Sequence, residues 1–146
     1  SQWSTFAINP LRLCYHKSEV MRMKLDMVGI IVNDMTQALS FYQTLGFNVL
    51  EEASPDYTEL QNNGVRISLN SLQMITGVYG FAPSQQGDKI ELAFLCETAA
   101  EVDNTVKKMS QAGYIVFKEP WNAPWGQRYA IIKDVDANLI SLFAPL

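Results

Sequence analysis

Residues 25–47 read LDMVGIIVNDMTQALSFYQTLGF, and this stretch predicts a strand, a tight connection and a helix in quick succession. Its apolar run over 27–32 is rich in β-branched residues, which favours a short buried strand. Asp34 is a good N-cap for the helix that follows, and Gly46 suits the left-handed residue that ends one. The stretch therefore predicts a strand over 27–32 and a helix over 35–45.

Three further strands are predicted after this helix, over residues 47–51, 57–61 and 65–69. The last two flank Asn62-Asn63-Gly64, a sequence typical of a tight hairpin turn. The first half of the chain is therefore expected to run strand–helix–strand–strand–strand.

The same order of patterns returns in the second half of the chain. Its expected elements are a strand over 90–96, a helix that begins with a capping box of Thr98 and Glu101 and ends at Gly113, strands over 114–118, 128–133 and 139–143, and a loop over 119–126. The triplets Ile67-Ser68-Leu69 and Ile140-Ser141-Leu142 occupy equivalent places in the two halves. A repeat of this length is too long for a solenoid unit, so it indicates a duplicated domain with a shared cavity.

These patterns predict an α+β fold of two βαβββ modules, over about 24–75 and about 88–146. Together they form a single domain over 23–146, because 146 residues suffice for one hydrophobic core and not for two. Residues 1–22 show no clear amphipathic period. We interpret them as an N-terminal extension, either a weakly structured tail or an arm that packs on a partner subunit.

The composition argues against several classes of function. The net charge is −4 and the longest cationic stretch is Lys107-Lys108, which disfavours nucleic-acid binding. No apolar run approaches the roughly 18 residues of a membrane span, and the first residues lack the layout of a signal peptide. Cys14 and Cys96 do not form a zinc-type spacing, and a reduced, cytoplasmic setting is the simplest interpretation. The single histidine, His16, excludes motifs built on several histidines.

Residues 25–47 resemble the first module of the glyoxalase/bleomycin-resistance/dioxygenase superfamily, also called vicinal-oxygen-chelate proteins. The stretch WGQRYAIIKDVDANLISLF, residues 125–143, resembles the closing motif of that family. The resemblance implies curved mixed sheets around a cavity, and a homodimer. The family's last turn has Pro and Gly where this chain has Val135 and Ala137, so Asn138 is expected to take the positive φ there.

Metal-dependent members of that family place one ligand on the first strand and one on the last strand of each module, drawn from His, Glu and Gln. The resemblance carries these positions onto Met27, Ser68, Glu91 and Ser141. Of these, Glu91 alone is an ordinary metal ligand, whereas a catalytic site usually has three protein ligands. We therefore expect no metal and no other cofactor, which argues against glyoxalase or dioxygenase chemistry through a Lewis acid.

The alternation of side chains along a strand predicts which residues face the cavity. Cys96 is expected to face the helices with Val28, Ile30 and Val32, and so to be an inert, packed thiol. The predicted cavity side receives Met27, Gly29, Ile31, Arg66, Ser68, Asn70, Glu91, Ala93, Leu95, Arg128, Ala130, Ile132, Leu139, Ser141 and Phe143. A mostly apolar cavity with a few polar groups is the usual form of a small-molecule site.

Charged residues give this predicted cavity its chemistry. Glu91 either contacts a ligand, acts as a base, or pairs internally with Arg128 or Arg66, because a carboxylate in an apolar cavity is costly unless it is paired. Arg128 either binds an anionic group or locks Glu91 or the neighbouring loop. No catalytic residue is assigned, because the sequence shows no second acid or base beside Glu91.

Aromatic residues complete the candidate site. Trp121 and Trp125 either stack on a planar ligand or anchor the predicted loop by burial, and Tyr57 is a candidate for the cavity mouth. The candidate ligand-binding residues are Glu91, Arg128, Trp121, Trp125, Ser68, Ser141, Met27 and Tyr57.

The function that these residues favour is metal-independent binding of a small organic molecule, by analogy with bleomycin-resistance members that sequester a drug at a dimer groove. The acidic chain suits a cationic guest. The alternative is an enzyme of the same superfamily, either a metal-free lyase or isomerase with Glu91 as its base, or a dioxygenase-like metal enzyme whose ligands lie one register away from the positions given above. A protein-interaction module with a vestigial cavity is a third hypothesis.

Overall fold

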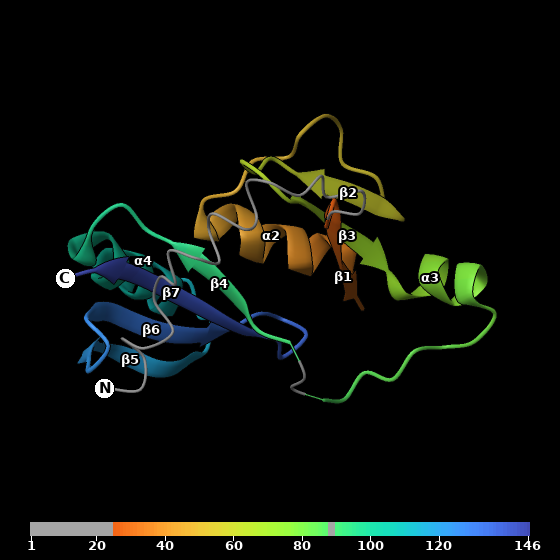
Figure 1. The fold of residues 1–146 in the computed structure, drawn as a ribbon. Coiled ribbons are helices and arrows are strands. Elements are labelled where there is room, and N and C mark those ends of the chain that lie inside the picture. Colours follow the sequence, from red (N-terminus) through yellow and green to blue (C-terminus); the bar gives the residue numbers. More distant parts are fainter. Residues whose placement is uncertain (1–24, 88–89) are drawn as a thin grey trace, which may run out of the picture.

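The structure is a computed structural model that describes residues 25–87 and 90–146. The extension predicted over residues 1–22 lies outside the described residues. The described chain forms two mixed sheets with helices packed against them (Figure 1), which confirms the predicted α+β class.

Module 1 begins as the sequence predicts. It contains β1 (Met27–Val32), α2 (Met35–Leu45), β2 (Tyr57–Leu60) and β3 (Arg66–Ser71), with the sheet order β1-β3-β2. Asp34 caps α2, because its carboxylate accepts a hydrogen bond from the Gln37 amide at 2.9 Å. Gly46 ends the helix with a φ of 126°, a value that glycine adopts without a steric penalty.

The strand predicted over 47–51 is reduced to a single bridge between Val49 and Leu60. Glu51-Glu52 and Pro55 follow this bridge. Glutamate and proline both disfavour strands, so the chain leaves the sheet after one paired residue.

A helix that the sequence analysis did not predict follows β3. This helix, α3 (Leu72–Tyr79), starts at Ser71, whose hydroxyl accepts a hydrogen bond from the Met74 amide, and ends at Gly80 with a φ of 79°. The helix buries Ile75, leaves Val78 and Tyr79 exposed, and lies at the end of the molecule (Figure 1).

Module 2 repeats the same architecture with a complete sheet. It contains β4 (Leu92–Leu95), α4 (Ala99–Gln111), β5 (Val116–Ala123), β6 (Gln127–Lys133) and β7 (Leu139–Pro145), with the sheet order β4-β7-β6-β5. Thr98 caps α4 by accepting a hydrogen bond from the Glu101 amide at 3.1 Å, as the capping-box pattern predicts.

The two modules match in strand register, which supports the duplication inferred from the sequence. In module 1, Gly29 pairs with Ser68 across the parallel strands β1 and β3. In module 2, Ala93 pairs with Ser141 across the parallel strands β4 and β7. The first and last strands of each module are thus neighbours, and the two predicted triplets take equivalent positions.

The prediction of a loop over 119–126 is wrong for residues 119–123, because β5 continues to Ala123. Two irregularities in the β5–β6 register, between Val116 and Lys118 and between Lys118 and Trp121, accommodate the stretch. Pro120 lies within the second irregularity on an edge strand, where its missing N–H leaves no ladder bond unmade. Trp121 is therefore a strand residue with a defined side.

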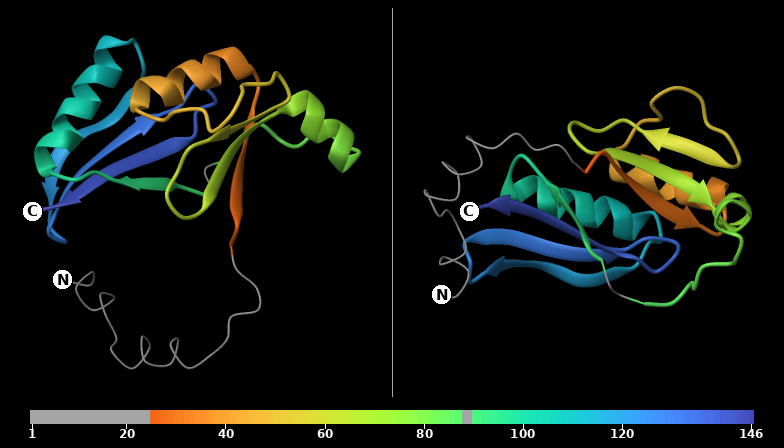
Figure 2. Two further views of the ribbon diagram at one scale, coloured as in Figure 1. Left: turned by 90° about the horizontal axis from the view of Figure 1, so that it is seen from above. Right: turned by 45° about the vertical axis from the view of Figure 1, so that its right-hand side comes forward.

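Helices α2 and α4 lie next to each other over the same side of both sheets (Figure 2). The core between helices and sheets includes Phe41 and Tyr42 from α2, Val102 and Met109 from α4, and Ile132 from β6. No described helix covers the opposite side of either sheet, and we call that side the open face.

The turn between β6 and β7 joins the two modules. Asp134 is 5% exposed, and its carboxylate accepts hydrogen bonds from the Tyr42 hydroxyl at 2.7 Å and from the Asn138 side chain at 2.8 Å. The positive φ expected at Asn138 is instead found at Ala137, at 65°. Asp134 fixes Asn138 through its backbone amide as well as its side chain, which leaves the left-handed conformation to Ala137.

Among the described residues, no helix is long and apolar enough to cross a membrane.

Candidate functional site

The open face carries the residues that the sequence predicts for β1, β3, β4 and β7. On β1, Ile30 and Val32 are buried under the helices, whereas Met27 lies on the open face. On β6 the prediction is wrong, because Ala130 and Ile132 are fully buried in the core. The open face of β6 instead presents the alternate residues, Gln127, Tyr129, Ile131 and Lys133.

Arg128 is therefore not a residue of the open face. Its guanidinium donates to both carboxylate oxygens of Asp103 on α4, at 2.8 Å and 3.2 Å, and to the Asn122 side chain at 3.1 Å. The internal pairing with Glu91 that the sequence allowed is contradicted. Arg128 holds α4 against the edge of the sheet, and it has no contact with the aromatic side chains of the open face described below.

The open face of module 1 is occupied by an ionic network. Arg66 forms ion pairs with Asp26 at 2.9 Å and Glu59 at 2.6 Å, and the Tyr57 hydroxyl donates to Glu59 at 2.9 Å. Hydrogen bonding from Arg66 lowers the pKa of the Glu59 carboxyl below its usual value. Arg66 therefore does not pair with Glu91, and Tyr57 contacts Met27 through its hydroxyl, 3.5 Å from the sulfur.

Beneath this network lie buried polar side chains. Ser68 is fully buried and Asn70 is 7% exposed, and neither the Ser68 hydroxyl nor the Asn70 carbonyl oxygen has a hydrogen-bond partner among the described residues. A Cβ at Gly29 would lie 2.5 Å from the Asn70 amide nitrogen. Glycine at this position thus leaves space for the Asn70 side chain, and the charged residues of this face are paired with one another.

The open face of module 2 is arranged in two rows that run across its four strands. The first row is Lys118, Ile131, Ser141 and Ala93, and the second is Trp121, Tyr129, Phe143 and Leu95. Ala93 is exposed and Leu95 is 68% exposed, so the β4 end of both rows is open to solvent. A ligand reaching this face meets an aromatic row beside a more polar one.

The aromatic row is a connected cluster of rings. Tyr129 contacts Trp121 and Trp125 edge to face, with centroids 5.3 Å and 5.4 Å apart, and stacks on Phe143 at 6.1 Å. Trp121 and Trp125 also meet edge to face at 6.0 Å. The structure thus brings together the two tryptophans predicted for the site and adds Tyr129, which the wrong β6 alternation had concealed.

Two lysines lie on the same face. The Lys118 ammonium lies 3.8 Å from the centroid of the Trp121 ring, and the Lys133 ammonium lies 5.3 Å from that of Phe117. The sequence analysis placed neither lysine in the site. Lys118 was expected at the end of a strand, and the alternation predicted for residues 128–133 left Lys133 off the cavity side. Their contacts with aromatic rings are cation–π interactions, which orient the lysines over the face.

Glu91 and Ser141 meet as the superfamily resemblance suggests. The Ser141 hydroxyl donates to the Glu91 carboxylate at 3.1 Å, at the edge of the first row. Glu91 is exposed, and this hydrogen bond leaves its other carboxylate oxygen available to a ligand.

Comparison with protein-family models gives a match over residues 24–142 to the Glyoxalase/Bleomycin resistance protein/Dioxygenase superfamily. This chain belongs to that superfamily. Curated proteins give no match. The vicinal-oxygen-chelate fold expected from the sequence is thereby confirmed for this superfamily member.

Solved structures from the superfamily resemble the chain over most of its length. A glyoxalase/bleomycin resistance protein/dioxygenase family enzyme from Burkholderia phytofirmans PsJN is 25% identical, with a TM-score of 0.77 over 85% of this chain and 100% of the other. A glyoxalase-related enzyme from Fulvimarina pelagi is 17% identical, with a TM-score of 0.76 over 84% and 88%. A lactoylglutathione lyase from Agrobacterium tumefaciens is 14% identical, with a TM-score of 0.63 over 83% and 92%. The last two likenesses show the fold alone.

The positions at which superfamily members hold a metal do not fit one in this chain. Met27 offers a thioether, Ser68 a fully buried hydroxyl, and Ser141 a hydroxyl that donates to Glu91. A divalent cation needs several carboxylate, imidazole or thiolate donors, and Glu91 alone is of that kind. Within residues 25–87 and 90–146, no group of three or more His, Cys, Asp or Glu side chains is placed to hold a metal ion.

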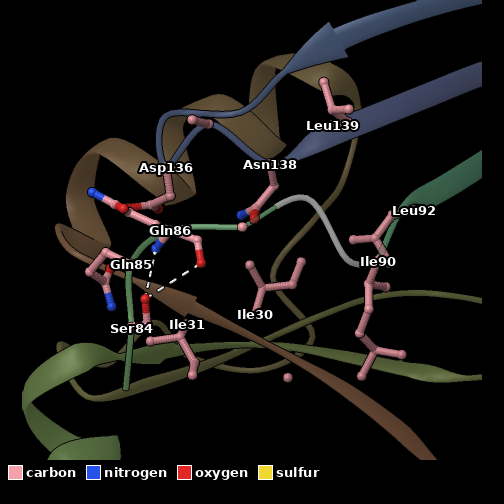
Figure 3. A pocket seen from close by; sticks show the side chains of 14 residues that line it. Ile30, Ile31, Ser84, Gln85, Gln86, Ile90, Leu92, Asp136, Asn138 and Leu139 are labelled. Atoms are coloured by element: carbon pink, nitrogen blue, oxygen red, sulfur yellow. Dashed lines mark hydrogen bonds between the residues drawn. The ribbon is translucent and has the colours of Figure 1, made fainter. Parts of the chain in front are cut away.

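A cavity of about 470 Å³ lies elsewhere, at the seam between β1, residues 84–87 and the β6–β7 turn (Figure 3). None of the eight predicted ligand-binding residues lines it. Of its polar side chains, Ser84 bonds with the Gln86 backbone and Asn138 with Asp134. Asp136 accepts from the Asn33 amide through one carboxylate oxygen, and its other oxygen is buried without a hydrogen-bond partner among the described residues. The open face of module 2 is the stronger candidate site of this superfamily member, because it gathers four of the eight predicted ligand-binding residues: Trp121, Trp125, Glu91 and Ser141.

Proposed function

We propose that this protein binds a small, planar organic molecule on the open face of module 2 without the help of a metal. The observation that carries the proposal is the cluster of Trp121, Trp125, Tyr129 and Phe143, whose rings are partly exposed on a face that no described helix covers. Aromatic side chains in such an arrangement offer apolar area and ring faces to a flat ligand.

Polar groups beside the cluster would orient such a ligand. Lys118 stands at one end of the first row, and Ser141, with Glu91 bonded to it, lies towards the other. A few polar groups next to an apolar surface are the usual composition of a small-molecule site. Of the predicted residues, Trp121, Trp125, Glu91 and Ser141 enter the proposed site, whereas Arg128, Ser68, Met27 and Tyr57 lie outside it.

We test the proposal with three ligands that share a naphthalene ring and differ in charge: 2-naphthoate, 2-naphthamide and 2-naphthylmethylamine. Titration calorimetry in the presence of a chelator is expected to detect binding of at least one of them. Replacing Trp121 with alanine is expected to weaken that binding about 10-fold, since a truncated aromatic contact in a binding site costs about 1.4 kcal/mol.

Tyr79→Ala is the matched control, because Tyr79 is an exposed aromatic residue on α3, in the other module. It is expected to leave the affinity unchanged. The proposal would be refuted if none of the three ligands bound, if binding required a metal, or if Trp121→Ala bound as well as the parent protein.

We further propose that the open face is completed by a second copy of the chain in a homodimer. Leu95 on β4 is 68% exposed and Ile90 just before it is 80% exposed, which is unfavourable for apolar side chains that remain in water. Sedimentation velocity is expected to give a species of twice the 16.4 kDa chain mass, and Leu95→Glu is expected to shift it towards the monomer. A monomeric parent protein would contradict this proposal.

A further inference from the structure

The cations on the strands of the described chain fall into two groups. The guanidiniums of Arg66 and Arg128 are each held in ion pairs with carboxylates. The ammonium groups of Lys118 and Lys133 form no ion pair with a carboxylate of the described residues, and each lies over an aromatic ring of the module 2 open face. An acidic chain thus presents two uncompensated positive charges on the face proposed to bind a ligand.

The nearest acidic residues do not neutralise Lys118. Glu119 follows it in sequence, but lines a cleft on the helix side of the sheet with Lys107 of α4. Glu91 lies on the far side of the face, ahead of β4, and is hydrogen-bonded to Ser141 of β7. Three strand spacings separate β5 from β4, which is about 14 Å and longer than the Debye length of about 8 Å at physiological ionic strength.

The position of Lys118 also fits the aromatic row. Its ammonium lies 3.8 Å from the centre of the Trp121 ring, and its strand position pairs with Ile131 in the neighbouring row. A ligand ring packed against Trp121 would therefore place a substituent beside Lys118. A cationic substituent would compete with the lysine for the ring face, whereas an anionic one would pair with it.

We infer that the module 2 face selects a planar aromatic anion, such as an aromatic carboxylate, and that Lys118 is the residue that determines this specificity. The inference rests on the proposed function, since it names the ligand class of the same site. The net charge of the chain suggests a cationic ligand instead. An anionic ligand is inferred here because a ligand meets the local charge of the face, and not the total charge of the protein.

The three naphthalene ligands test the inference separately from the proposed function. 2-Naphthoate is expected to bind about 2- to 5-fold more tightly than 2-naphthamide, as for an exposed charge pair, and more tightly still than 2-naphthylmethylamine. Added salt is expected to weaken the binding of the carboxylate and to leave that of the amide nearly unchanged.

Lys118→Met keeps most of the side-chain length and removes the charge. It is expected to abolish the preference for the carboxylate while leaving the affinity for the amide intact, whereas Lys107→Met on the helix side is expected to change neither. Two outcomes would overturn the inference and leave the proposed function standing. Binding could depend on Trp121 and show no preference for the carboxylate, or the preference could persist in Lys118→Met. Failure of all three ligands to bind would overturn both.

Discussion

Replacing Asp134 with alanine is expected to lower the free energy of unfolding by about 3–4 kcal/mol, because it leaves several buried donors without an acceptor. The carboxylate accepts hydrogen bonds from the Tyr42 hydroxyl and from the Asn138 side chain, and also from the Asp136 and Asn138 amides at 2.9 Å and 2.8 Å. Urea unfolding followed by circular dichroism measures the loss.

Two milder variants show which contacts matter. Tyr42→Phe keeps the ring in its edge contacts with Phe41 and Phe47 and removes one donor, so about 1–2 kcal/mol is expected. Burial and the nearby Asp134 carboxylate raise the pKa of the Tyr42 phenol well above its usual value, so the hydroxyl remains a donor at every pH at which the protein folds. Asp134→Asn is expected to lie between the two. A loss below about 1 kcal/mol for Asp134→Ala would show that the turn does not hold the modules together.

The repeated fold could be predicted because local signals and periodicity agree in both halves. Asp34 and Thr98 cap the helices that they were expected to cap, and Ser68 and Ser141 take equivalent places in the two sheets. Helix α3 was missed because its eight residues are mostly apolar, so it lacks the polar face that marks an amphipathic helix.

The site was predicted less completely, for a physical reason that lies in strand alternation. A shift by one residue moves every side chain of a strand to the other face, and the prediction placed β6 one residue out of phase. Arg128 was therefore assigned to the cavity, and Tyr129 was left out of it. The partner of Tyr129 across β6 and β7 is Phe143, which was assigned correctly, so the antiparallel register would have revealed the error.

Sequence patterns could not predict the full length of the bulged strand β5. Its two register irregularities and Pro120 resemble a loop in sequence, yet they place Lys118 and Trp121 on the same face. The duplicated modules thus differ in what they present. Module 1 pairs its charges internally through Arg66, whereas module 2 leaves Lys118 and Lys133 without carboxylate partners among the described residues.

Alkylation of Cys96 by iodoacetamide at pH 8 is expected to be about 100-fold slower in the folded protein than in urea. Cys96 is 9% exposed, and burial raises the pKa of its thiol from 9.0 to about 11, with a smaller contribution from Glu101. Since the thiolate is the reactive form, a rise of about two pH units removes about 99% of it. The measurement uses Cys14→Ser, so that Cys96 is the single thiol.

The pH dependence separates the raised pKa from simple exclusion of the reagent. With a raised pKa, the native rate should climb about tenfold per pH unit from 8 towards 11, and Ser110→Cys on the exposed side of α4, in a chain lacking both native cysteines, should react at the ordinary rate. Because folding raises the pKa, the thiol contributes stability that is complete below about 9 and is lost as the pH rises through about 11. A native rate equal to that in urea at pH 8 would contradict the packed thiol, and with it the assignment of Cys96 to the helix-covered face.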